Sequence, residues 1–161
     1  MGEMAEKISK INKDELLNLL QSAFAEEWLA YYQYWIGAKV AEGVERPKVV
    51  EEFYEHAIEE LKHADWLADR IIQLGGVPIL NPLDWEKFAK CKYDAPTNAD
   101  TKVLVEQNLI AERCAIGRYQ QICEFCQHKD YETFRISRKI LKEELEHEQE
   151  MEDFKNDFKH Y

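Results

Sequence analysis

The sequence lacks long apolar runs. None reaches the roughly 18 residues of a membrane span, and the first residues, MGEMAEKISKI, contain no signal-peptide core of about 7 to 15 apolar residues. Basic residues are also in short supply, because 21 Lys and Arg face 32 Asp and Glu, for a net charge of -11. Such a chain is poorly suited to binding phosphate backbones or anionic lipid. We therefore expect a cytoplasmic protein with no membrane partner and no nucleic-acid partner.

Glycine and proline are scarce too, with 6 and 4 among 161 residues, whereas a fold of many turns needs more of both. The hydrophobic fraction of 45% and the aromatic fraction of 12% exclude a disordered acidic chain. A length of 161 residues suits one domain, and residues of high helix propensity dominate the composition. We expect residues 1–161 to form a single all-α domain.

Cysteine is rare as well. The four positions are too few for a disulfide scaffold, and a cytosol keeps such thiols reduced by default, so redox and metal roles stay open: Cys91, Cys114, Cys123 and Cys126. Cys123 and Cys126 form a CxxC pair late in a predicted helix, and the sequence contains no second CxxC to complete a rubredoxin-type site. This arrangement favours two core thiols over a redox pair.

Apolar residues recur at helical spacing in four stretches of the chain. The first two stretches predict helices over about 12–42 and 47–75, with Asn12 as the first N-cap, and residues 1–11 are expected to be frayed. Two further helices are predicted, around 105–122 and 134–158. Residues 76–98 carry three of the four prolines and one short helix, and they are long enough to return along the bundle. This connectivity is that of a ferritin-like four-helix bundle with one long crossover.

Each predicted long helix places a glutamate in the middle of its apolar stripe, where an ionised side chain is costly unless compensated. In the second and fourth helices a histidine follows three residues later. The six residues are Glu27, Glu60, His63, Glu112, Glu144 and His147. The two glutamates of the first hairpin are 33 residues apart and those of the second are 32 apart. Each hairpin therefore repeats the order Glu, turn, Glu-x-x-His.

Two such halves facing each other would bring four carboxylates and two imidazoles to one level of the bundle, as in di-metal carboxylate proteins. Two divalent cations would then balance the four negative charges. The alternative for any single glutamate is a solvated helix face, which we expect for the neighbouring acids Glu26, Glu59, Glu143, Glu146 and Glu148. Glu59 or Glu143 could instead contact the metal ligands from outside. Asn108 is a candidate hydrogen-bond partner for the two histidines.

These motifs resemble the ferritin-like superfamily, and most closely its bacterioferritin-type di-iron centre. The segments that carry the resemblance are EEWLAYYQY (residues 26–34), EELKHAD (59–65) and KEELEHE (142–148). The resemblance implies that Glu27 and His63 hold one iron. Glu112 and His147 would hold the other, and Glu60 and Glu144 would bridge the two irons. It also places Tyr34 in a hydrogen bond near the metals, where the phenol could donate electrons or simply pack.

Two departures refine the resemblance. Bacterioferritins ligate haem through a methionine just after the second-helix bridging glutamate, and here that residue is Leu61, so no haem is expected. The chain has a short helix in the crossover and no fifth long helix, and in this it is similar to Dps proteins, which form dodecameric cages. The combination resembles the thioferritin branch, which implies a Cys91–Cys114 pair beside the metal centre. The alternative is two unrelated thiols at these positions.

The leading interpretation is a ferroxidase that handles oxidative stress. It would oxidise Fe(II) with H₂O₂ or O₂ at a site for two iron ions per chain and store the product inside a homo-oligomeric cage. Oxygen and imidazole ligands suit iron, with manganese as the alternative metal. A second interpretation keeps the metals without mineral storage, as in a peroxidase or catalase of the rubrerythrin or manganese-catalase type. A third is an acidic helical scaffold without metal.

Overall fold

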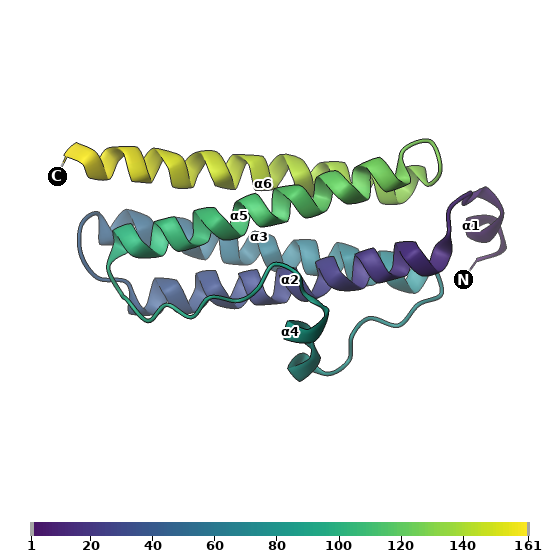
Figure 1. Cartoon of the computed structure of the whole chain (residues 1–161), viewed down its shortest axis with the longest axis horizontal. Helices are drawn as coiled ribbons and strands as arrows, with labels where there is room; N and C mark the ends of the chain where they lie inside the picture. Colours follow the sequence, from purple (N-terminus) through teal and green to yellow (C-terminus); the bar gives the residue numbers. More distant parts are fainter. Residues whose placement is uncertain (1, 161) are drawn as a thin grey trace.

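The computed structural model describes residues 2–160, with the side chains of all of these except Ala5 and Glu6. Four long helices lie side by side: α2 (Lys13–Val40), α3 (Arg46–Gln73), α5 (Thr101–Cys126) and α6 (Tyr131–Asp157) (Figure 1). The shorter elements are α1 (Glu3–Ile8), η1 (Pro82–Asp84), α4 (Trp85–Phe88) and η2 (Phe158–His160). The predicted all-α, ferritin-like four-helix bundle with a short helix in its crossover is confirmed. Among the described residues, no helix is both apolar and long enough to cross a bilayer.

Three of the four long helices, α2, α5 and α6, begin at side-chain caps. Asn12 caps α2 as predicted, since its side chain accepts hydrogen bonds from the backbone N–H groups of Asp14 and Glu15. Asp100 and Asp130 cap α5 and α6 in the same way. These caps satisfy backbone donors that have no partner within the helix, so they fix where these three helices start.

The ends of α2 and α3 each fall two residues before the predicted positions. α2 ends because the backbone of Ala41 is already non-helical, with a ψ of 132°, whereas α3 ends at Gly75, which directly follows the C-cap residue Leu74 and adopts a φ of 80°. Residues with a side chain rarely adopt such positive φ values, so the helical backbone is interrupted there. The α2–α3 and α5–α6 connections are short, and each pair of helices forms an antiparallel hairpin (Figure 1).

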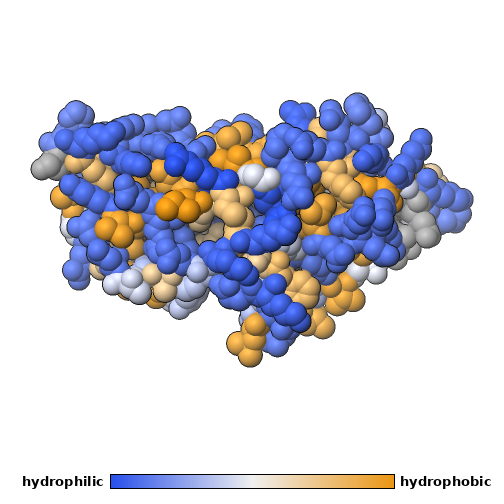
Figure 2. Space-filling model, in the orientation of Figure 1, coloured by the Kyte–Doolittle hydropathy of each residue, from blue (hydrophilic) through white to orange (hydrophobic). Residues whose placement is uncertain are grey.

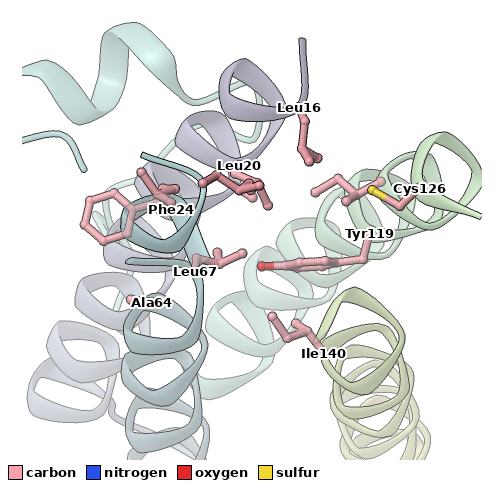
Figure 3. Packing of buried hydrophobic residues seen from close by; sticks show 12 residues of the cluster. Leu16, Leu20, Phe24, Ala64, Leu67, Tyr119, Cys126 and Ile140 are labelled. Atoms are coloured by element: carbon pink, nitrogen blue, oxygen red, sulfur yellow. The ribbon is translucent and has the colours of Figure 1, made fainter. Parts of the chain in front are cut away.

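Two hydrophobic clusters fill the bundle, one toward each end. The first includes Leu20 of α2, Leu67 of α3, Tyr119 of α5 and Ile140 of α6, whose side chains converge from all four long helices (Figure 3). The second includes Tyr34, Phe53, Leu109 and Met151 from the same four helices. On every long helix, the predicted polar residues lie between the members of these two clusters. The bundle therefore has an apolar core at both ends and a polar layer between them.

The crossover follows α2 and is fastened to it along its length. Gln21 and Ser22 of α2 hydrogen-bond the backbone near Val77, Ile79 and Phe88, and residues further along α2 hold the later part of the crossover. Around η1 and α4 the crossover projects from the bundle (Figure 1). Figure 2 shows hydrophobic surface on this projection, where Leu80 and Leu83 are among the exposed residues.

The expectation of a frayed N-terminus is wrong for the described residues. Residues 3–8 form α1, in which Lys7 pairs with Glu3 one turn earlier. The segment after α1 is fastened to the α5–α6 connection, because the backbone N–H of Lys10 donates to the carbonyl of Lys129 and Ser9 Oγ donates to Asp130. These long-range hydrogen bonds involve no apolar stripe, so periodicity could not predict them.

Candidate metal centre

The polar layer brings together the six residues singled out in the sequence. Their exposed fractions lie between 0% and 3%: Glu27, Glu60, His63, Glu112, Glu144 and His147. They form two overlapping groups, in each of which four potential ligand atoms lie within 4.8 Å of one another. Glu60 and Glu144 belong to both groups. The layer therefore consists of two halves that share a pair of carboxylates.

The first half is centred on His63 of α3. Its Nδ1 atom lies 3.1 Å from a Glu60 oxygen, 3.2 Å from a Glu144 oxygen and 3.3 Å from a Glu27 oxygen. The carboxylates come from three helices, α3, α6 and α2. One imidazole nitrogen is thus surrounded by three buried acidic side chains.

The second half is centred on His147 of α6 and is built in the same way. Its Nδ1 atom lies 3.4 Å from a Glu60 oxygen and 3.7 Å from oxygens of both Glu112 and Glu144. Glu60 directs one oxygen to each histidine, and so does Glu144. The two halves therefore reproduce in space the internal repeat of the sequence.

The outer nitrogen of each histidine binds an acid from the opposite ExxH helix. His63 Nε2 lies 2.9 Å from Glu143, and His147 Nε2 lies 2.8 Å from Glu59. Glu59 and Glu143 therefore contact the site from outside, which was the alternative to a solvated helix face. The choice of Asn108 is wrong, because its side chain pairs with Gln33 at 3.1 Å. The signal was present in the sequence, because each acid directly precedes the glutamate of an ExxH motif. Such contacts orient an imidazole for metal binding.

Two tyrosines hold the remaining glutamates. The Tyr34 hydroxyl donates a hydrogen bond to Glu112, and the Tyr119 hydroxyl donates one to Glu27. The contact of Tyr119 is not among the predictions made from the sequence. The repeat could have found it, because Tyr119 follows Glu112 by seven residues just as Tyr34 follows Glu27. Each tyrosine reaches across to the other hairpin, so the pair ties the two halves together.

The electrostatics show that this layer needs positive charge. Burial raises the pKa of Glu27, and the Glu60 carboxylate raises it further. Burial and the Glu144 carboxylate likewise raise the pKa of Glu112 to about 8. Burial acts in the same direction on Glu60, but its interactions with the neighbouring His147 and His63 outweigh it and hold the Glu60 pKa well below its usual range. Four ionised carboxylates cannot coexist here without further compensation.

Several polar atoms at the centre have no hydrogen-bond partner among the described residues. They are Glu27 Oε2, both carboxylate oxygens of Glu144 and His147 Nδ1. Buried polar atoms without partners are rare because each costs free energy. Divalent cations would bind these oxygens and nitrogens and would balance the acidic charge. The donor set of oxygen and imidazole nitrogen, without thiolate, suits iron or manganese.

A pocket of about 410 Å³, including its open mouth, reaches the polar layer from the α2 and α5 side. Glu27, Glu112 and Gln33 line it, together with Cys91 and Tyr93 of the crossover. It gives small molecules a route to the layer.

Cys91 of the crossover and Cys114 of α5 form a disulfide at this pocket, with their Cα atoms 5.8 Å apart. Glu26 is 6% exposed and accepts hydrogen bonds from the backbone N–H groups of Lys90 and Cys91. The expectation of a solvated Glu26 is wrong, because the crossover covers it. The crossover has no periodic pattern, so the α2 side chains that it contacts cannot be predicted from the sequence.

Cys123 and Cys126 of α5 are free thiols, and both are buried in the bundle. Burial raises the pKa of the Cys126 thiol to about 12 and also raises that of Cys123. A thiol with a raised pKa is a poor nucleophile at neutral pH. These features agree with the preference for core thiols.

The fold and the polar layer define a class of protein, a four-helix bundle whose two equivalent hairpins enclose four carboxylates and two imidazoles. Residues 17–160 match the ferritin-like domain, and the chain belongs to that family. It is 35% identical to the DNA protection during starvation protein of Pyrococcus furiosus, over 86% of this chain and 75% of that protein. It is also 30% identical to the bacterial ferritin of Pseudomonas aeruginosa, over 81% and 77% of the two chains.

Solved structures agree with this assignment. The dodecameric thioferritin of Bacteroides fragilis, a bacterioferritin-related protein, superposes with a TM-score of 0.97 at 50% identity, over 99% of this chain and 96% of that one. Dps from Thermosynechococcus elongatus superposes with a TM-score of 0.84 at 20% identity, over 94% of each chain, which shows the shared fold. The resemblance to the ferritin-like superfamily drawn from the sequence is therefore confirmed.

Proposed function

We propose that this protein is a ferroxidase that oxidises Fe(II) at the polar layer and stores the Fe(III) inside a hollow oligomer. The observation that carries the proposal is the pair of histidine-centred halves that share Glu60 and Glu144, with four inward polar atoms lacking a partner. A scaffold would gain nothing from such a costly arrangement. Relatives that are named bacterial ferritin, bacterioferritin and thioferritin support iron as the substrate.

We propose the following ligand roles. Glu27 and His63 hold one Fe(II), and Glu112 and His147 hold the second. Glu60 and Glu144 bridge them, which is supported by the two oxygens that each directs toward both histidines. Manganese is the alternative that the same donors accept.

The bound iron pair supplies the redox chemistry, since two Fe(II) ions together provide the two electrons that convert one H₂O₂ to two water molecules once two protons are added. The protein holds the ligands in place. Glu143 and Glu59 fix the rings of the two histidines, while Tyr34 and Tyr119 hold the terminal glutamates. The pocket beside α2 admits the oxidant, and the acidic net charge favours approach of cations.

The cysteine pair at the pocket is assigned a redox role in the same proposal. Reduced Cys91 and Cys114 together hold two electrons, and giving them up re-forms the disulfide with release of two protons. Cys91 lines the route to the iron ligands and Cys114 is bonded to it, so either peroxide or Fe(III) in the pocket could accept these electrons. Haem plays no part, because Leu61 occupies the position of the haem-ligating methionine.

The assembly is proposed to be a dodecameric cage, supported by the likeness to the dodecameric thioferritin at 50% identity. The test combines native mass with the iron content per chain, before and after Fe(II) and H₂O₂ are added to the metal-free protein. A ferroxidase with storage should hold two iron ions per chain at first and many more after repeated additions. A peroxidase without storage would remain at two, and a scaffold would bind none. The double variant Glu60→Ala with Glu144→Ala should no longer bind the two iron ions that each wild-type chain holds at first.

A further inference from the structure

A third histidine lies beside the polar layer, outside the proposed ligand set. His56 of α3 is 2% exposed, and its Nε2 atom lies 2.9 Å from Glu150 of α6 and 3.3 Å from Glu52, one turn earlier on α3. The two carboxylates reach the surface, with side-chain exposures of 46% for Glu150 and 25% for Glu52. The cluster therefore joins a buried imidazole to solvent-accessible acids across the α3–α6 interface.

The geometry of this cluster suits a cation. Each of the three residues offers one ligand atom, and these atoms all lie within 4.8 Å of one another. Ligand atoms bound to one metal at about 2.0 to 2.2 Å lie roughly 3.0 to 3.5 Å apart in tetrahedral or octahedral arrangements. The two separations from His56 Nε2 are close to that range. Only small side-chain movements would be needed to enclose an ion.

The packing of the bundle does not require polar residues at these positions. The internal repeat that superposes His63 on His147 also gives the equivalents of the cluster in the other half. Ile140 matches His56, Ile136 matches Glu52 and Trp66 matches Glu150. All three equivalents belong to, or pack against, the first hydrophobic cluster. The same fold positions are thus apolar in one half and potential metal ligands in the other.

The cluster also contacts the polar layer. The His56 ring stacks on the ring of His147, with centroids 3.9 Å apart. A ring nitrogen of His56 lies within 4.8 Å of potential ligand atoms of Glu112 and His147. His56 Nδ1 is buried and has no hydrogen-bond partner among the described residues. His56 can therefore serve as a ligand on the outer side and lies next to the Glu112 half on the inner side.

We propose that Glu52, His56 and Glu150 form a third divalent-cation site, which loads Fe(II) into the Glu112 half of the layer. Binding at this site depends only on its own residues, whereas the loading role rests on the proposed function. Carboxylate and imidazole ligands suit Fe(II), Mn(II) or Zn(II). The half-exposed acids would capture the ion from solvent, and the buried imidazole would pass it inward.

The binding test uses Zn(II), which undergoes no redox change, with the full-length metal-free protein. Equilibrium dialysis should find three Zn(II) per chain, and crystals soaked in Zn(II) should show anomalous density beside His56. Glu52→Gln combined with Glu150→Gln should bind two. The matched control is Glu51→Gln with Glu146→Gln, which removes the same charge from exposed positions on the same two helices and should still bind three.

The outcomes separate this site from the main layer. A wild-type protein that binds two Zn(II), or an outer double variant that still binds three, would overturn the third site. Binding of one ion at His56 and none in the layer would overturn the proposed function and leave the third site intact. The loading role is tested with the variant Glu52→Gln with Glu150→Gln, which should oxidise limiting Fe(II) about tenfold more slowly. A loss of this size is usual when a residue that contacts a metal ligand is mutated. An unchanged rate would overturn the loading role.

Discussion

Glu26 of α2 and Arg118 of α5 form a buried ion pair, with 2.9 Å between Arg118 Nη2 and Glu26 Oε1, and the same carboxylate holds the crossover. Both side chains are about 5% exposed or less. The Glu26 carboxylate also accepts the backbone N–H groups of Lys90 and Cys91. This single side chain therefore links two helices of different hairpins to the segment that carries the disulfide.

Removing the Glu26 carboxylate should destabilise the protein strongly. Glu26→Ala leaves the Arg118 guanidinium buried without its partner and frees two backbone donors, so we expect a loss of about 3 to 5 kcal/mol. Glu132→Ala removes a partner from the exposed pair with Arg135 and should cost at most about 1 kcal/mol. Urea unfolding of both variants at one protein concentration measures the difference. Equal, small losses would show that the ion pair does not hold the crossover.

The two tyrosines should act as equivalent supports of the metal ligands. Tyr119→Phe removes the hydrogen bond to Glu27, and Tyr34→Phe removes the one to Glu112. Each change should weaken metal binding in its own half by about 10- to 100-fold, the usual effect of losing a contact behind a ligand. Tyr32→Phe, at an exposed position, is the control. Titration of the metal-free protein with Co(II) measures both affinities, and an effect of Tyr34→Phe alone would refute the equivalence.

The site residues within the repeated hairpins can be predicted from the sequence, because helical periodicity determines which side chains face inward. Glu27, Glu60 and their counterparts could be placed on this basis before any coordinates. Tyr119 could be placed by the same repeat, because it follows Glu112 at the spacing that separates Tyr34 from Glu27. The contacts of the crossover cannot be predicted in this way, because its residues have no regular apolar spacing. The sequence therefore predicts Glu26 as a surface residue, whereas in the structure the crossover covers it.

The disulfide should stabilise the bundle by restricting the unfolded chain. Cys91 and Cys114 are separated by 23 residues, and closing a loop of that size is worth about 3 kcal/mol in the chain-entropy account. Cys91→Ser with Cys114→Ser should lower the free energy of unfolding by about that amount, and reducing agent should then have no further effect. Urea unfolding with and without reductant gives the comparison. A wild-type protein indifferent to reductant would contradict a stabilising crosslink.

The Asp130–Arg70 pair should make stability depend on pH at the acidic end. Burial raises the pKa of Asp130, but the backbone N–H of Thr133 and the Arg70 guanidinium outweigh it and lower the pKa below its usual range. Because the folded pKa lies below the unfolded value of about 3.9, the stabilisation is complete above that pH. It is lost as the pH falls through the folded value.

The difference in unfolding free energy between the wild type and Asp130→Asn isolates this effect, because all other carboxylates titrate alike in both proteins. We expect a large difference at pH 7 that narrows progressively below about pH 4, as protonation removes the charge from the wild-type side chain. Asp153→Asn, at an exposed position of α6, should show a small difference at every pH. A difference for Asp130→Asn that stayed constant down to pH 2 would mean that the Arg70 pair contributes through packing and not through charge.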